Sequence, residues 1–137
     1  MSYRFLPHTA DVLIEIQAPT FDDLLADCVA VVRELVAGPS VVTARETRPI
    51  AVTGDQPRDV VLHFVHDLLD TFATDAFIPA AFDATRSSVR EASGVVRGEL
   101  FDAARHDPQP EVKALTRHGL EVTETKEGWH ALLLFDV

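Results

Sequence analysis

The chain of 137 residues is 47% hydrophobic and 25% charged, a balance typical of one globular domain with enough apolar side chains to form a core. No apolar run approaches the roughly 20 residues that a membrane span requires, and the first residues lack a signal-peptide pattern, so we expect a single cytoplasmic domain over residues 1–137. The net charge of −10, from 22 acidic and 12 basic residues, argues against a protein that mainly binds nucleic-acid phosphates and favours a bound cation or a basic protein surface as partner.

The first amphipathic helix is predicted between a strand and a Gly-Pro break. Residues 12–17 alternate apolar and polar side chains, which indicates a strand with one buried face. Thr20 is a suitable N-cap, with Asp23 at the capping-box position, and Gly38 ends the helical pattern. Cys28 is the only cysteine and lies in the apolar stripe, so a disulfide framework and a cysteine metal site are both excluded. The stripe consists of Phe21, Leu24, Leu25, Cys28, Val31, Val32 and Leu35.

A second helix is predicted after a short strand at residues 49–53. Pro57 suits its first turn, because the missing N–H of proline has no partner there in any case. His63 and His66 lie beside the apolar stripe, and their spacing differs from the i, i+4 spacing of a two-histidine metal site. The apolar face consists of Val60, Val61, Phe64, Val65, Leu68, Leu69 and Phe72.

The second half of the chain is predicted to be mainly β. Loose alternation indicates strands at residues 81–84, 88–91, 95–101, 111–116, 120–124 and 129–135. The last two strands should form a hairpin through a turn at residues 126–128. Two helices and several strands with short connections predict an α+β fold: a two-layer sandwich of mostly antiparallel sheet, with both helices packed on one face of the larger sheet.

Two carboxylates stand at the ends of apolar strands that are far apart in the chain. Asp11 precedes the first predicted strand, and Asp136 follows the apolar run at residues 132–135. If the two strands are neighbours, these carboxylates could share a cation, with a main-chain or terminal oxygen of Val137 as a further ligand. A solvated loop aspartate and an exposed C-terminus are the commoner explanation, and the residues alone leave both open.

Lys113 is an isolated basic residue in a short predicted strand that follows a proline-rich loop. It could neutralise buried carboxylates or contact a phosphate, or it could simply point into solvent. No phosphate loop, dinucleotide-binding glycine pattern or nucleophile elbow is present, and the six histidines are scattered. The sequence therefore indicates no catalytic machinery of its own.

Five segments form a pattern that spans nearly the whole chain. They are His8-Thr9-Ala10-Asp11, Thr20-Phe21-Asp22-Asp23-Leu24, Gly98-Glu99, Glu111-Val112-Lys113-Ala114-Leu115-Thr116 with His118, and Gly128-Trp129 through Asp136-Val137. In this order they resemble the archease family, and the first, fourth and last segments are jointly specific. The second helix departs from the family, with His66-Asp67-Leu68-Leu69 where Asn-Glu-Leu-Leu is more usual, and Arg117 stands before His118 where an aromatic residue is typical.

The resemblance implies an accessory protein of RtcB-type RNA ligases, which join RNA ends through a GMP-linked histidine in tRNA splicing and RNA repair. Such a protein promotes guanylylation of the ligase and restores multiple turnover; it is not an enzyme, and it meets RNA only through the ligase. The resemblance also implies an α+β sandwich and a divalent metal ion, Mg²⁺, Mn²⁺ or Ca²⁺, held by Asp11 and Asp136 beside Val137. It implies a role in activation for Lys113.

Two alternatives from other classes remain. The first is a chaperone-like binding module for an RNA-modifying enzyme, without metal chemistry, in which Asp11 would be dispensable. The second is a small metal-dependent hydrolase that uses Asp11, Asp136 and a histidine. The lack of a recognisable nucleophile–base arrangement argues against the hydrolase.

Overall fold

The computed structural model describes residues 2–6 and 11–137, which contain two helices and eight strands. The helices are α1 (Phe21–Ala37) and α2 (Pro57–Asp75). The strands are β1 (Ser2–Leu6), β2 (Val12–Ala18), β3 (Glu46–Thr53), β4 (Phe77–Ser87), β5 (Glu91–Leu100), β6 (Ala114–Leu115), β7 (Glu121–Thr125) and β8 (Gly128–Asp136). Within the described residues, no helix has the length and apolar character needed to cross a membrane.

Local signals set the ends of both helices. At the start of α1, the Thr20 hydroxyl accepts a hydrogen bond of 3.1 Å from the amide of Asp23, so the predicted N-cap is confirmed. The helix ends at Gly38, whose φ of 59° is one that residues with a side chain rarely adopt. Helix α2 begins with Pro57 and ends at Ala76, which is left-handed with a φ of 58°.

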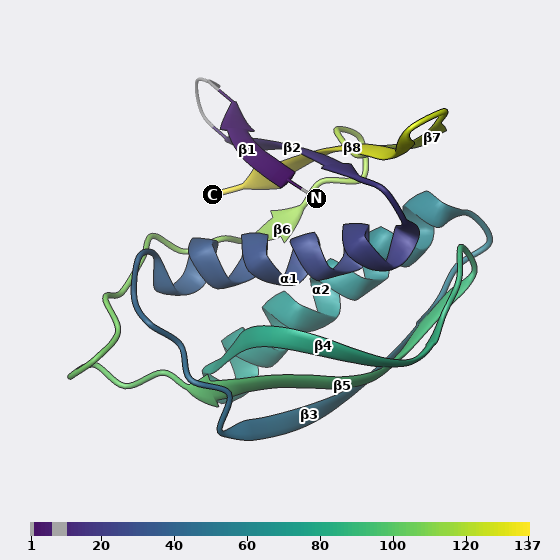
Figure 1. Ribbon diagram of the computed structural model, residues 1–137. Helices are drawn as coiled ribbons and strands as arrows, with labels where there is room; N and C mark the ends of the chain where they lie inside the picture. The colour runs from purple at the N-terminus through teal and green to yellow at the C-terminus, as the bar shows by residue number, and fades with distance from the viewer. Residues whose placement is uncertain (1, 7–10) are drawn as a thin grey trace.

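The strands form two antiparallel sheets, and the two helices lie between them (Figure 1). The larger sheet has the order β1-β2-β8-β6, with β7 also paired to β8, and the smaller sheet has the order β3-β5-β4. The predicted α+β class is confirmed, as is the C-terminal hairpin, which β7 and β8 form. The predicted two layers become three, because the smaller sheet covers the side of the helices that faces away from the larger sheet.

The burial of the helices explains the third layer. Eleven of the 17 residues of α1 are buried, which is more than a helix with one solvent-facing side normally buries. Phe21 of α1 packs edge-to-face on Trp129 of the larger sheet, with ring centroids 5.1 Å apart. Phe64 of α2 packs in the same way on Phe82 of the smaller sheet, at 5.0 Å. Aromatic contacts thus tie the helix layer to both sheets.

Two strand predictions were wrong, and one strand was missed. The pairing of β1 with β2 was not predicted. Residues 88–90 form a turn between β4 and β5 rather than part of a strand, because the Ser88 hydroxyl accepts hydrogen bonds from the amides of Arg90 and Glu91. The predicted strand at residues 111–116 is reduced to the two residues of β6.

Candidate functional site

The pairing of β2 with β8 brings Asp11 and Asp136, which are far apart in the sequence, to the same end of the larger sheet. Val12, the first residue of β2, lies opposite Phe135 of β8 in antiparallel register. Asp11 is the residue before Val12, and Asp136 is the residue after Phe135, so the same register continued by one position puts the two aspartates opposite each other. Opposite residues of an antiparallel pair project from the same face. The structure therefore confirms that the strand after Asp11 and the strand that ends at Asp136 are neighbours.

Strand β6 pairs with the opposite edge of β8 at the same end. Ala114 lies opposite Asp136, and the amide of Lys113 donates a hydrogen bond of 2.8 Å to the main-chain oxygen of Asp136. The side chains of Lys113 and Asp136 are exposed, and Asp11 is half-buried. We refer to Asp11, Lys113, Asp136 and Val137 as the strand-end site. Lys113 is exposed whereas Leu115, two positions further along the chain, is 1% exposed.

The strand-end site offers oxygen ligands on an open surface. Among residues 2–6 and 11–137, no group of three or more His, Cys, Asp or Glu side chains is close enough to hold a metal ion. A cation here would therefore rely on two carboxylates, a main-chain oxygen such as that of Val137, and water. That donor set suits Mg²⁺, Mn²⁺ or Ca²⁺, which accept oxygen ligands and retain water, and does not suit a zinc site. His8, Thr9 and Ala10, which belong to the first of the five matching segments, lie outside the described residues.

A buried carboxylate that the sequence analysis did not single out as a site residue lies at the end of β5. Glu99 is 2% exposed, and its Oε1 accepts a hydrogen bond of 2.5 Å from Nη2 of Arg105. Its Oε2 accepts from the amide of Thr43 at 2.5 Å and lies 3.2 Å from Nε2 of His106. The bond from Arg105, assisted by Thr43 and His106, lowers the pKa of Glu99 to about 2, although burial acts to raise it. We call these four residues the Glu99 clamp.

Hydrogen bonds fix the tautomer of His106 in the clamp. Its Nδ1 accepts a hydrogen bond of 2.9 Å from the amide of Asp102, so Nδ1 carries no proton. The proton must then be on Nε2, which donates it to Glu99. A neutral histidine therefore satisfies both a main-chain amide and a buried carboxylate, and His106 is itself 1% exposed.

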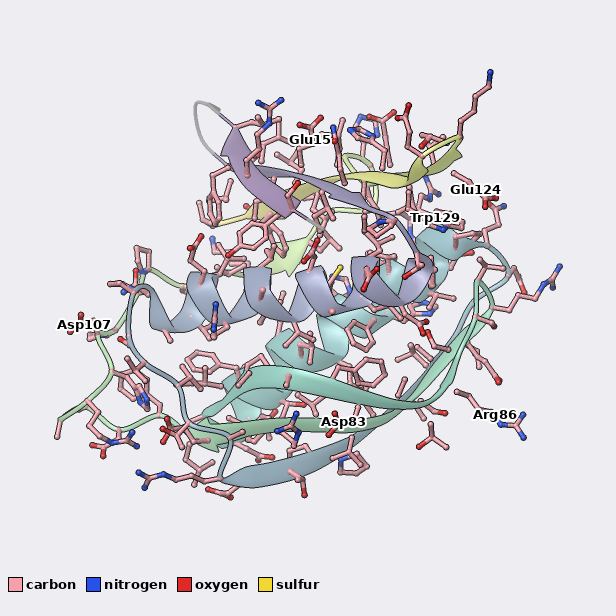
Figure 2. The ribbon with its side chains drawn as sticks, in the orientation of Figure 1. Glu15, Asp83, Arg86, Asp107, Glu124 and Trp129 are labelled. Atoms are coloured by element: carbon pink, nitrogen blue, oxygen red, sulfur yellow. The ribbon has the colours of Figure 1, made fainter. Side chains whose placement is uncertain are left out.

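The clamp holds the start of an irregular segment, residues 107–113, which we call the strap. The amide of Asp107 donates to the Ser40 hydroxyl at 2.9 Å, and Figure 2 shows Asp107 at the edge of the molecule beside the end of α1. Gln109 packs so closely on Gly38 that a Cβ at Gly38 would lie 2.6 Å from its Nε2. The strap ends at Lys113, so the clamp and the end of α1 together fix the path that leads to the strand-end site.

The sequence could not reveal the clamp. Arg105 and His106 lie in a segment without hydrophobic periodicity, and nothing in their spacing from Glu99 indicates a contact. The only sequence signal for Glu99 was that Gly98-Glu99 is one of the five matching segments. Gly98 is needed for close packing, because a Cβ at this position would overlap with the main-chain oxygen of Ile78 on β4.

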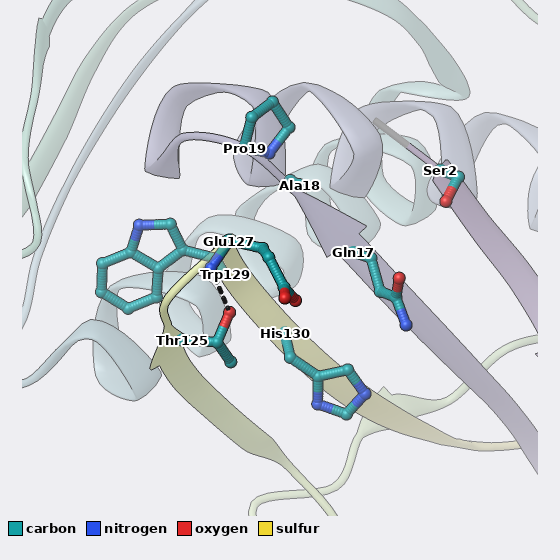
Figure 3. A pocket seen from close by; sticks show the side chains of 8 residues that line it. All are labelled: Ser2, Gln17, Ala18, Pro19, Thr125, Glu127, Trp129 and His130. Carbon is teal, nitrogen blue, oxygen red and sulfur yellow. Dashed lines mark hydrogen bonds between the residues drawn. The ribbon is translucent and has the colours of Figure 1, made fainter.

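A separate pocket of about 370 Å³ lies at the other end of the β2–β8 pair (Figure 3). It is lined by Gln17 of β2 and by Trp129 and His130 of β8. Nε2 of His130 lies 2.8 Å from Oε2 of Glu15, and this hydrogen bond, together with one from Arg4, lowers the pKa of Glu15. His130 is thus engaged within the sheet, and the pocket shares no lining residue with the strand-end site.

Comparison with known proteins gives a consistent result over the whole chain. The family model described as "Archease protein family (MTH1598/TM1083)" matches residues 3–137. A protein archease from Ictalurus punctatus is 28% identical over 131 residues, which cover 91% of this chain and 79% of the relative. A protein archease from Methanopyrus kandleri is 26% identical over 140 residues and is matched over the full length of both chains.

Two solved structures share the fold. The solution structure of Methanobacterium thermoautotrophicum protein 1598 superposes with a TM-score of 0.81 at 20% identity, covering 98% of each chain. The crystal structure of a Thermotoga maritima protein, described as an archease and possible chaperone, superposes with a TM-score of 0.70 at 20% identity. It covers 96% of this chain and 94% of its own.

Proposed function

The chain belongs to the archease family, and on this basis we propose that it is an accessory protein that activates an RtcB-type RNA ligase and is not itself a catalyst. It would promote guanylylation of the ligase and sustain repeated turnover in tRNA splicing or RNA repair, in the cytoplasm, where it would meet RNA only through the ligase. The observation that carries the proposal is the convergence of the matching segments. Asp11, Lys113 and Asp136 come from three different parts of the chain and meet at one end of β8.

A divalent metal ion fits the donors of the strand-end site. Asp11 and Asp136 would hold it through their carboxylates, with a main-chain oxygen of Val137 alongside and water in the remaining positions. When bound, such an ion supplies positive charge beside the phosphates of a nucleotide. Because Asp136 is exposed, that charge would be available to a partner protein rather than enclosed.

Lys113 would serve the same site through its ammonium group. Among the described residues, its side chain forms no salt bridge, and neither do Asp11 and Asp136. Its main chain is fixed to Asp136, so its position is set while its charge remains available. An exposed ammonium at this end of β8 could balance part of the charge of the two carboxylates and could meet a phosphate of the ligase-bound nucleotide.

The direct test measures guanylylation of a purified RtcB-type ligase by GTP, with and without this protein. We expect a faster single-turnover rate and continued turnover when the protein is present. The Asp11→Ala variant should lose the acceleration while keeping the fold. An unchanged ligase rate with the wild-type protein would refute the activator function.

A chaperone-like binding module without metal chemistry is the second candidate. The description of the Thermotoga maritima relative as a possible chaperone favours it. The two functions differ in their dependence on the strand-end site. A chaperone should protect its partner equally well with Asp11→Ala, whereas metal-dependent activation should not survive this change.

A further inference from the structure

The strap is bordered on both sides by apolar grooves. On one side, a groove of about 470 Å³ is lined by Leu69, Phe72 and Ala73 of α2 and by Phe101. On the other side, a groove of about 370 Å³ is lined mainly by Phe5, Val12, Leu35 and Val137. Three strap residues, Gln109, Pro110 and Val112, line both grooves. We call the first of these grooves the α2 groove and the second the α1 groove.

The grooves present apolar surface to solvent next to the strand-end site. Phe5 is 41% exposed and Val137 is 40% exposed, although both are large hydrophobic residues. Val12 and Val137 belong to the α1 groove and also directly adjoin Asp11 and Asp136 in the chain. Adjacent exposed apolar surface of this kind marks sites of protein contact. Each groove has the volume needed to receive one or two side chains of a partner.

The electrostatics of the grooves specify what they accept. Both lie at the C-terminal ends of helices, where the helix dipole is negative, and neither α1 nor α2 has a basic residue in its last turn to offset it. Among the described lining residues, Glu111 is the only charged one in the α2 groove and Glu34 the only one in the α1 groove. Lys113 is two positions from Glu111 but lines neither groove. The apolar surface is therefore bordered by negative charge.

We propose that this face docks a segment of a partner protein in which a large apolar side chain stands next to a lysine or arginine. The apolar side chain would enter the α2 groove, and the cation would meet Glu111 and the C-terminal end of α2. The inference rests on the proposed function for the identity of the partner, an RNA ligase. Docking there would place the partner directly beside Lys113 and Asp136.

Charge-matched variants test the contact. Glu111→Lys reverses the charge at the α2 groove, and Glu124→Lys makes the same change in β7, on the opposite side of the molecule from the strap (Figure 2). Ala73→Gln adds bulk at an exposed position in the α2 groove, and Ala26→Gln adds the same bulk at an exposed position of α1 outside both grooves. We expect Glu111→Lys and Ala73→Gln to weaken binding to the ligase by about tenfold, and both controls to bind within about twofold of the wild type.

Measuring ligase binding and guanylylation on the same samples separates the two proposals. If the wild type accelerates guanylylation while Glu111→Lys and Ala73→Gln bind as tightly as their controls, the docking inference is overturned and the activator function stands. If the wild type binds with the expected variant pattern but leaves guanylylation unchanged, the docking inference stands and the activator function fails.

A second measurement needs no ligase. Amide NMR shifts are recorded with the dipeptides acetyl-Phe-Arg-amide and acetyl-Phe-Glu-amide at equal concentration. We expect the arginine peptide to shift amides of the strap and the last turn of α2, and to do so more than the glutamate peptide. Equal shifts with both peptides, or shifts confined to other regions, would overturn the inferred preference for a basic partner.

Discussion

At the scale of single residues, three groups from two loops converge on the buried carboxylate of Glu99. Its pKa of about 2 in the folded chain lies below the ordinary value of 4.5. A lowered carboxyl pKa means that the ionised form stabilises the fold above about pH 4.5, and that this stabilisation decreases as the pH falls towards 2.

We therefore expect Glu99→Gln to lower the free energy of unfolding by about 1–3 kcal/mol near neutral pH, because Arg105 loses one of its two carboxylate partners, Asp102 being the other. The difference between variant and wild type should shrink as the pH is lowered through this window. Urea unfolding at a series of pH values measures both effects. A difference that stays constant down to the lowest pH would show that the charge of Glu99 does not contribute.

Lys113 should behave in the opposite way, affecting activity but not stability. Its side chain is exposed, so Lys113→Ala should leave the melting temperature unchanged. If its ammonium contacts a phosphate in the transition state, the loss is worth roughly 1.5–3 kcal/mol, or one to two decades in the rate of ligase guanylylation. Lys113→Arg should restore only part of this rate, because a planar guanidinium does not replace a compact ammonium. Wild-type rates with Lys113→Ala in a single-turnover assay would mark it as an ordinary surface residue.

At the scale of elements, β6 is short and depends on a neighbour outside its sheet. Its two residues pair with the end of β8, and Nε2 of His66 on α2 lies 3.0 Å from the main-chain oxygen of Leu115. A two-residue strand has few hydrogen bonds of its own, so a side-chain donor from a helix is a substantial addition.

We expect His66→Phe to loosen the pairing of β6 with β8. The amides of Lys113 and Thr116 donate to main-chain oxygens of β8, so their hydrogen exchange reports this pairing directly. Loss of one hydrogen bond, about 1 kcal/mol, should speed their exchange about fivefold. His63→Phe is the matched control, because His63 lies on the same helix but contacts the oxygen of Thr53 instead. Equal acceleration by both variants would contradict a local role for His66.

The elements also show where sequence patterns are informative. Both helices were predicted, with the start and end of α1 and the start of α2, because Thr20, Gly38 and Pro57 are residues whose backbone chemistry specifies a helix end. The strand at residues 111–116 was overpredicted, because local alternation cannot show how much of a segment finds a pairing partner. The length of β6 is set by β8, which is distant in sequence.

At the scale of the whole molecule, the strand-end site exists only when both ends of the chain are folded together. A divalent ion that binds there should therefore stabilise the folded state alone. An ion at ten times its dissociation constant would add about 1.4 kcal/mol, which for a chain of this length raises the melting temperature by about 5 °C. Asp11→Ala should abolish this dependence on Mg²⁺, Mn²⁺ or Ca²⁺ without unfolding the protein. Melting curves that are indifferent to metal in both proteins would exclude a metal site here.

The overall arrangement was predictable only in part. The α+β class follows from the order of helical and alternating segments, and the meeting of Asp11 with Asp136 follows once β2 and β8 are recognised as neighbours. The third layer was missed because a helix with a wide apolar surface can be buried by one sheet or by two, and the pattern does not distinguish them. The grooves beside the strap were also missed, since they form from several separate parts of the chain.

The central position of β8 has a consequence for how the protein is made. This strand pairs with β2, β6 and β7, yet it is the last element in chain order. During synthesis, α1, α2 and the smaller sheet can fold while β8 is still within the ribosome, but the larger sheet has no centre until β8 emerges. Its pairing with β2 then closes a loop of nearly the entire chain, which is entropically costly and slow. We expect the apolar side of the helices that will face this sheet to stay uncovered until then, so this interval is when a nascent chain most needs protection from aggregation.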